Sequence, residues 1–113
     1  MSCIFCKVVE KSIPAKIVYE DDLVVAFEDI SPQAPVHLLL IPRKHIPTVL
    51  DIEDEDRYLI GYMHKIAGEL AKEREIAERG FRLIMNCNAE SGQTVFHIHL
   101  HVLGGRPMRW PPG

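Results

Sequence analysis

The segment from Phe96 to Val102 alternates apolar residues with histidines, and this alternation constrains the fold more than any other feature of the chain. Successive side chains of a β-strand point to opposite faces, so the apolar residues share one face and the histidines share the other. The two faces consist of Phe96, Ile98, Leu100 and Val102 on one side, and of His97, His99 and His101 on the other. We therefore predict a strand over residues 95–103, anchored on a core, with imidazoles about 6–7 Å apart along its open side.

The rest of the chain indicates further strands and one long helix. Three β-rich segments at residues 17–19, 23–28 and 36–41 precede the helix, and one at residues 81–85 follows it. Acidic residues over 51–56 favour the start of the helix, and Gly80 is its predicted stop. Inside the helix, apolar residues recur at three- and four-residue spacing, at Leu59, Met63, Ile66, Ala67, Leu70 and Ala71. A short helix or turn is predicted around residues 3–9.

This order of elements, with connections of hairpin length, predicts an α+β fold. We expect an antiparallel β-sheet of about five strands with one long helix and a short N-terminal helix. The sequence contains no internal repeat and no Gly/Ser linker, and 113 residues suit one domain. We therefore predict a single domain over residues 1–113, with residues 104–113 as an extended C-terminal tail.

Composition excludes several classes of partner. The formal net charge of −3 and the pI near 6.0 give the whole chain no attraction to nucleic acid or to an anionic membrane. The longest apolar run, residues 38–41, is too short to cross a bilayer, and the N-terminus lacks the pattern of a secretion signal. Three cysteines, an odd number, favour a reducing compartment. We expect a cytoplasmic protein without nucleic-acid or membrane partners, whose anionic ligands bind at a local site.

The three aligned histidines allow two kinds of chemistry. Neutral imidazole is a good zinc ligand, but His97 and His101 would lie about 13 Å apart on a straight strand, too far for one ion. The alternative is nucleophilic catalysis on phosphorus, because the neutral ring is abundant near pH 7 and can form a covalent intermediate. The central residue, His99, is the best placed for attack, with a histidine on each side to orient it or to contact phosphate oxygens.

The loops that flank the predicted strand suit phosphate chemistry, although each is a weak signal alone. Residues 91–94 read Ser-Gly-Gln-Thr, and Gly104–Gly105 follow the strand. Glycine lets the backbone approach a ligand closely, and the main-chain N–H groups, Gln93 and Thr94 can donate hydrogen bonds to phosphate oxygens. No GxxxxGK segment is present, which excludes a P-loop.

These motifs together resemble one known family. The segment His97–Leu103 matches the His-φ-His-φ-His-φ-φ signature, where φ is apolar, of the histidine triad (HIT) family. The likeness spans nearly the whole chain and includes residues 13–22, 29–37, 41–46 and 103–108. The closing Trp-Pro-Pro-Gly of residues 110–113 is similar to the HINT branch in particular. The resemblance implies a homodimer whose sheets join into one, hydrolysing purine nucleoside 5′-phosphoramidates and acyl-nucleotides to the nucleoside monophosphate.

The resemblance also implies roles for the histidines. His99 matches the nucleophile, which would form a nucleotidyl-histidine intermediate, and His101 matches the histidine beside the phosphate. His97 and His37 match supporting histidines. A nucleotide-binding or sensing module with vestigial hydrolysis is the alternative function, because a phosphate cradle binds whether or not it reacts.

Further residues match the nucleotide site of the family. Asp29 matches the residue that accepts hydrogen bonds from the ribose hydroxyls, and Ile30 would pack on the base. The phosphate and leaving-group loop corresponds to Asn86, Gly92, Gln93 and Thr94. The family often has serine at position 94, so the extra methyl of threonine would alter rate or leaving-group preference. The tail at residues 110–112 is similar to one that reaches the partner subunit's site.

A CxxC pair at Cys3 and Cys6 suggests a structural zinc site. A thioredoxin-like role requires a preceding strand, for which there is no room. Two further ligands would complete a tetrahedral site, and the resemblance to bacterial family members with an N-terminal CxxC implies His45 and His97. Two reduced cysteines in the core are the alternative. We expect no cofactor to be required for catalysis itself.

Overall fold

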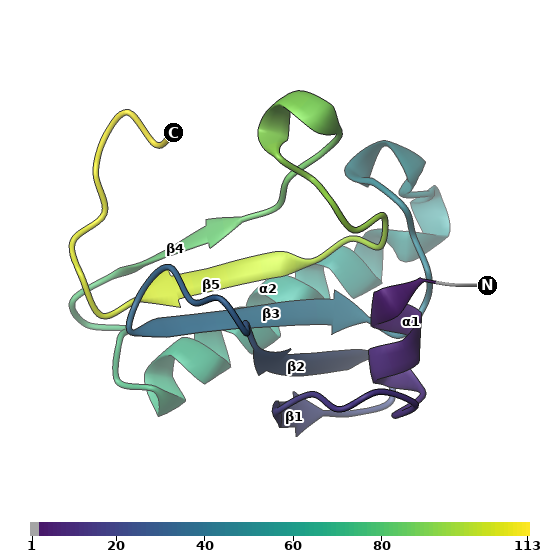
Figure 1. Cartoon of the computed structure of the whole chain (residues 1–113), viewed down its shortest axis with the longest axis horizontal. Helices are drawn as coiled ribbons and strands as arrows, with labels where there is room; N and C mark the ends of the chain where they lie inside the picture. The colour runs from purple at the N-terminus through teal and green to yellow at the C-terminus, as the bar shows by residue number, and fades with distance from the viewer. Residues whose placement is uncertain (1–2) are drawn as a thin grey trace.

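The computed structural model describes residues 3–113 and contains one five-stranded antiparallel sheet in the order β1-β2-β3-β5-β4 (Figure 1). The strands are β1 Ile17–Glu20, β2 Val24–Glu28, β3 Val36–Pro42, β4 Phe81–Ile84 and β5 Leu100–Gly104. The helices are α1 Ile4–Val9 and α2 Arg57–Glu73, with 3-10 turns η1 Val49–Asp51, η2 Asp54–Asp56 and η3 Ala89–Ser91. The predicted α+β architecture is confirmed. None of the helices within residues 3–113 is long and apolar enough to cross a membrane.

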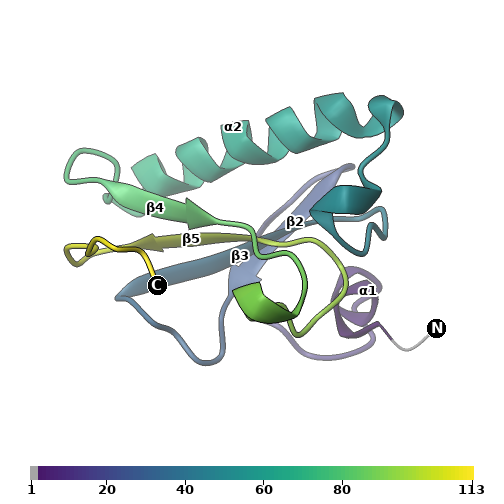
Figure 2. The same cartoon turned by 90° about the horizontal axis from the view of Figure 1, so that it is seen from above.

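The sheet separates two hydrophobic clusters, because alternate residues of each strand point to opposite faces. On one face, Leu38 and Leu40 of β3 pack with the buried side of α2. On the other face, Leu39 and Ile41 pack against Phe5 of α1. Figure 2 shows α2 along one side of the sheet, with α1 and the loop that carries η3 on the opposite side. The open part of this second face is where the functional site lies.

The long helix ends earlier than predicted. The helix stops at Glu73 instead of continuing toward Gly80, so the predicted stop was wrong. Glu75 adopts a left-handed conformation, with φ of 61°, and the N–H of Ile76 donates to the carbonyl of Ala71 at 3.0 Å. This is the hydrogen bond with which helices commonly close when a left-handed residue follows them.

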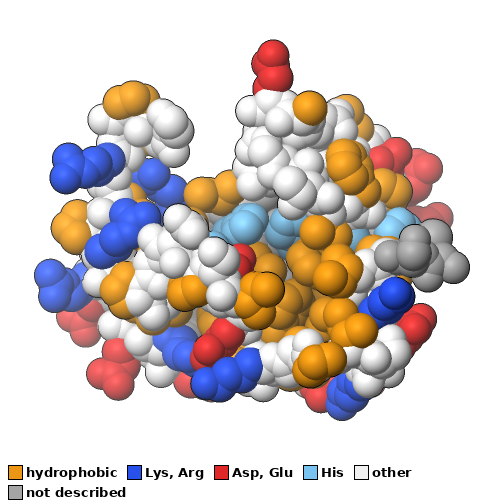
Figure 3. Space-filling model, in the orientation of Figure 1, with side chains coloured by type: hydrophobic (Ala, Val, Ile, Leu, Met, Phe, Trp, Pro, Cys, Tyr) orange, Lys and Arg blue, Asp and Glu red, His pale blue; other side chains and the backbone are white. Residues whose placement is uncertain are grey.

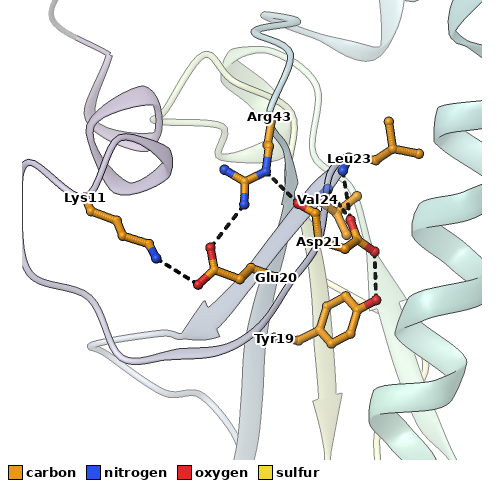
Figure 4. Close-up of polar contacts among 7 residues, drawn as sticks. All are labelled: Lys11, Tyr19, Glu20, Asp21, Leu23, Val24 and Arg43. Carbon is orange, nitrogen blue, oxygen red and sulfur yellow. Dashed lines mark hydrogen bonds and ion pairs between the residues drawn. The ribbon is translucent and has the colours of Figure 1, made fainter.

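The β1–β2 turn is fixed by a single carboxylate (Figure 4). Asp21 Oδ1 accepts hydrogen bonds from the main-chain N–H groups of Leu23 and Val24, at 2.8 and 2.9 Å. Its Oδ2 accepts from the hydroxyl of Tyr19 at 2.7 Å and from that of Tyr62 on α2. Although burial raises its pKa, these hydrogen bonds lower the pKa of Asp21 to about 2. The turn is thereby attached to the long helix.

The strand that carries the histidines is shorter than predicted. The β5 strand begins at Leu100, and residues 95–99 approach it as an irregular segment, so the prediction for these five residues was wrong. The N–H of Ile98 donates to the carbonyl of Ile46 at 2.7 Å, which ties this segment to the loop after β3. The bend also leaves Phe96 47% exposed, contrary to the predicted buried face, whereas Ile98 is buried as expected.

Candidate active site

Neighbouring strands bring His99, His101 and His37 onto one face of the sheet. On β5, His101 lies opposite Leu39 of β3, two residues from His37. The ring centroids of His99 and His101 are 5.1 Å apart, closer than the spacing expected from a straight strand. His37 and His101 are likewise neighbours, with ring centroids 5.2 Å apart. Histidine side chains form a row across this face, and the row begins at the foot of a hollow between the C-terminal tail and the loop containing η3 (Figure 3).

Hydrogen bonds determine which nitrogen of His99 carries its proton. His99 Nδ1 lies 2.8 Å from the main-chain oxygen of His97. A carbonyl oxygen can only accept, so Nδ1 must donate, and Nε2 of the neutral ring keeps a free lone pair. The ring of Phe5 meets the His99 ring edge-on, with centroids 5.0 Å apart, and the side chain is almost buried. The structure therefore fixes the orientation of the His99 ring and leaves a lone pair on Nε2.

His101 has the opposite tautomer. The N–H of Gln33 donates to His37 Nδ1 at 3.0 Å, so the proton of the neutral His37 ring is on Nε2. That Nε2 lies 2.9 Å from His101 Nδ1, which must accept. The proton of His101 is then on Nε2, where it can be donated to a ligand. Burial, together with the nearby rings of His99 and His37, lowers the pKa of His101 to about 4, so the ring is neutral near pH 7.

Asp29 completes this side of the site. Its Oδ2 lies 3.4 Å from His37 Nε2, and its Oδ1 accepts a hydrogen bond from the N–H of Ser31 at 2.8 Å. Burial lowers the pKa of His37 more than the Asp29 carboxylate raises it, so His37 is also neutral near pH 7. The carboxylate remains partly accessible and can accept further hydrogen bonds.

A cavity of about 420 Å³ opens beside His37 and His101. Asn86, two residues after β4, lines it, and so do residues of the C-terminal tail, including Pro111 and Pro112. The tail thus lies against a site formed by its own chain in this structure. A cavity of this size can hold a small organic ligand.

A second histidine-containing cluster lies at the other end of the row. Cys3, Cys6, His45 and His97 each offer one ligand atom, and all four atoms lie within 4.8 Å of one another. His97 Nε2 lies 2.8 Å from the carbonyl oxygen of Pro42, to which it must donate, so its Nδ1 lone pair faces the cluster.

The distances within this cluster fit a tetrahedral metal ion. Bonds of about 2.0–2.3 Å to nitrogen and sulfur place neighbouring ligand atoms about 3.3–3.8 Å apart. His97 Nδ1 lies 3.2 Å from His45 Nδ1, 3.5 Å from Cys3 Sγ and 3.6 Å from Cys6 Sγ, while Cys6 Sγ lies 3.3 Å from His45 Nδ1. The predicted four-residue group is thus brought together and could bind a metal.

Comparison with known proteins identifies the family. The model of the HIT domain matches residues 10–108. The chain belongs to the HIT family.

Relatives of the chain include proteins named as enzymes. Purine nucleoside phosphoramidase of Escherichia coli strain K12 is 54% identical over 105 residues, covering 93% of this chain and 88% of that protein. An uncharacterized HIT-like protein of Synechocystis is 54% identical over 110 residues, covering 97% and 96%. The crystal structure of a HIT family hydrolase from Legionella pneumophila superposes with a TM-score of 0.98 at 51% identity, covering 99% and 100%.

The structure of this HIT protein separates the residues of the predicted nucleotide loop. Thr94 is exposed and lines a shallow hollow with Cys3 and His45, apart from the cavity beside His101. Gly92 is exposed and has the left-handed φ of 89° that glycine accommodates. Ile30 is 99% exposed, free to meet a ligand.

Gln93 has a role that the sequence did not reveal. Its side chain is buried, and its amide contacts protein groups from three segments. A glutamine in a polar loop gives no sequence signal of this kind, because its partners are main-chain atoms and one of them, the carbonyl of Pro47, lies 46 positions earlier in the chain.

Proposed function

We propose that this HIT protein hydrolyses purine nucleoside 5′-phosphoramidates and related acyl-nucleotides to the nucleoside monophosphate through a nucleotidyl-histidine intermediate. The observation that carries the proposal is the contact of His99 Nδ1 with the carbonyl of His97, which leaves Nε2 unprotonated. Membership of the family, together with 54% identity to an enzyme named purine nucleoside phosphoramidase, supports the same reaction.

The two tautomers assign complementary tasks in the first step. His99 Nε2 attacks phosphorus, and the bond from phosphorus to the leaving nitrogen breaks. His101 Nε2–H donates a hydrogen bond to that nitrogen and keeps its proton, while solvent supplies the proton with which the amine departs neutral. His37 holds His101 in the required tautomer through the 2.9 Å contact with its Nδ1.

The second step returns a proton to solvent. Water attacks the phosphorus of the intermediate and releases one proton to solvent. The bond between phosphorus and His99 breaks, which releases the nucleoside monophosphate and restores the lone pair on His99 Nε2. The lowered pKa of His101 suits its role, because the ring stays neutral near pH 7 and serves as a hydrogen-bond donor through Nε2–H in both steps.

The remaining residues bind the nucleotide in this proposal. Asp29 accepts hydrogen bonds from the ribose hydroxyls, and Ile30 packs on the purine. Asn86, Gly92 and Thr94 contact the phosphate or the leaving group, and Gln93 acts through the loop that it holds. These assignments rest on the family resemblance, and Thr94 requires the loop to close over a bound ligand.

Replacement of His99 tests the nucleophile. His99→Ala should abolish turnover of adenosine 5′-phosphoramidate while circular dichroism shows an unchanged fold. His64→Ala is the matched control, because His64 is exposed on α2 and outside the site. A His99→Ala variant that retains a tenth of wild-type activity would refute the assignment.

A binding or sensing module is the competing function. Rapid-quench mass spectrometry on saturating adenosine 5′-phosphoramidate distinguishes the two, because only the enzyme accumulates a nucleotidyl adduct on His99. Absence of both adduct and product would favour binding alone. Parallel kinetics on adenosine and guanosine phosphoramidates would then establish the base preference.

We further propose that Cys3, Cys6, His45 and His97 hold a structural zinc ion. When bound, zinc would cross-link α1 to the loop after β3 and to the segment before β5, which stabilises a small domain. Burial of the His97 ring lowers its pKa, so the nitrogen is free to coordinate at neutral pH. Metal analysis should give one zinc per chain, with loss in Cys3→Ser and retention in Cys87→Ser. Unchanged zinc in Cys3→Ser would defeat the proposal.

We also propose a cytoplasmic homodimer. Free cysteines fit a reducing compartment, and β4 is an edge strand whose four residues are only half-buried. Pairing of two β4 edges would join the sheets, and the tail could then contact the partner's site. Size-exclusion chromatography with light scattering tests the dimer, and a monomeric mass would exclude it.

A further inference from the structure

Three arginines without acidic partners surround the cavity beside His101. Arg82, Arg106 and Arg109 line it, and its lining includes no aspartate or glutamate among residues 3–113. Basic side chains edge the hollow on the side of the C-terminal tail in Figure 3. In a chain with a net charge of −3, this cavity is a local concentration of positive charge.

Most arginines outside this cavity are paired with carboxylates. Arg43, Arg57 and Arg74 each lie within 3.5 Å of a carboxylate oxygen, on Glu20, Asp54 and Glu28 respectively, and only Arg79 has no such partner among residues 3–113. Within the described part of the chain, no carboxylate lies within 4.0 Å of the three cavity arginines. Their charges are therefore available to an incoming anion.

Main-chain contacts position two of these cations, Arg82 and Arg106, without neutralising them. Arg82 Nη2 donates to the carbonyl of Arg109 at 2.9 Å, and its guanidinium lies 5.9 Å from the ring centroid of Trp110. Arg106 Nε donates to the carbonyl of Gln33 at 3.0 Å. Each guanidinium retains further N–H groups, and their planar arrangement suits two-point recognition of a carboxylate.

The sheet register places this charge at a defined distance from the reacting centre. Ile84 on β4 lies directly opposite His101, and Arg82, two residues earlier, faces the same side of the sheet. Arg82 is therefore displaced by about 7 Å along the strand direction from His101, whose Nε2–H would donate a hydrogen bond to the leaving nitrogen. Asp29, the proposed ribose ligand, is not among the cavity-lining residues, so this cavity suits the leaving group better than the nucleoside.

We propose that Arg82, Arg106 and Arg109 select phosphoramidates whose leaving amine carries a carboxylate. This inference rests on the proposed phosphoramidase function and adds the chemical class of the leaving group. The carboxylate is not altered in the reaction. Its contacts with the arginines orient the leaving nitrogen toward His101 Nε2–H while the bond from nitrogen to phosphorus breaks.

Paired substrates of equal shape test the inference. Adenosine 5′-phosphoramidate carrying β-alanine on nitrogen has a free carboxylate, whereas the β-alaninamide derivative replaces that carboxylate with a neutral amide. Wild-type protein should show a kcat/KM at least about 10-fold higher for the carboxylate substrate, the ratio expected from a charge-assisted hydrogen bond. Arg109→Gln and Arg82→Gln should lower this ratio toward 1, and Arg57→Gln, on the exposed face of α2, should preserve it.

The outcomes distinguish this inference from the function on which it rests. No turnover of either derivative or of unsubstituted adenosine 5′-phosphoramidate would refute the phosphoramidase function. If wild-type protein hydrolyses both derivatives with a kcat/KM ratio near 1, the selection of a carboxylate is refuted but the phosphoramidase function is not. Equal losses on both derivatives in the arginine variants would also overturn it, because arginines that bind the nucleotide phosphate affect both substrates alike.

Discussion

Gln93 connects three segments around the active site, and its replacement by glutamate is the sharpest test of how the loop is held. The Gln93 Nε2 amide donates to the carbonyls of Pro47 and Val95 at 2.9 and 3.1 Å. Its Oε1 accepts from the N–H of Asn88 at 2.7 Å. Every hydrogen-bonding atom of the side chain is engaged, and the residue is 6% exposed.

Gln93→Glu retains the size of the side chain and the contact with Asn88 but replaces both donors with an acceptor. Two hydrogen bonds are lost, each worth about 1 kcal/mol, and two carbonyl groups then face a carboxylate in a buried site. We expect the free energy of unfolding to fall by about 2–4 kcal/mol at pH 7. The loss should shrink at low pH, where protonation restores one donor.

Urea unfolding followed by circular dichroism at fixed protomer concentration measures this change, since a dimer makes stability concentration-dependent. Gln33→Glu is the matched control, because Gln33 is exposed and donates a single side-chain hydrogen bond, to Ser31 at 2.9 Å. The control should change stability by less than about 1 kcal/mol. A loss below about 0.5 kcal/mol in Gln93→Glu would refute the role of Gln93 in holding the loop.

Three further measurements test other features of the structure. The pKa of His101 is about 4 in the folded protein, against an ordinary value of 6.5, so the unfolded chain binds more protons between pH 4 and 6.5. Acidification through this range should therefore lower the free energy of unfolding by up to about 1.4 kcal/mol per pH unit for this group. The urea midpoint of His101→Gln should depend less steeply on pH than that of wild type, and equal slopes would contradict the buried neutral ring. Gly104→Ala should cost about 1–3 kcal/mol in urea unfolding, because its Cβ would lie 2.5 Å from Ile76 Cδ1, whereas Gly68→Ala, with nothing within 4 Å, should cost nothing. Chelation of the proposed zinc should lower the melting temperature by roughly 5–10 °C in wild type but not in Cys3→Ser, and equal shifts in both would argue against the site.

The sequence predicted the elements with strong periodicity and missed those set by distant partners. Alternation predicted the core face of β5, and both Ile98 and Leu100 are buried. Residues 95–99 depart from a strand because Ile98 bonds to Ile46, a residue 52 positions earlier, which no local pattern encodes. The helix end was missed for a related reason. A non-glycine residue, Glu75, adopts the left-handed conformation, which composition does not predict.

The sequence predicted which residues form the candidate site better than it predicted how their side chains are arranged. The CxxC motif and the family resemblance identified all four members of the Cys3, Cys6, His45 and His97 cluster. The resemblance also named Asp29, His37 and His101, which lie together. The motifs indicated Gln93 as a ligand-binding residue but did not indicate that its side chain holds the loop, because its partners are main-chain atoms. They did not indicate the arginine-lined cavity either, which depends on the path of the tail.

Main-chain partners give the same residue type two different chemistries in this protein. The carbonyl of Pro42 accepts a hydrogen bond from Nε2–H of His97, which leaves the Nδ1 lone pair to face two thiols. The N–H of Gln33 instead occupies Nδ1 of His37 and forces the proton onto Nε2, the atom that faces Asp29 and His101. A metal at that second group would require loss of this proton or of the Gln33 contact, so its geometry favours hydrogen-bond donation over coordination.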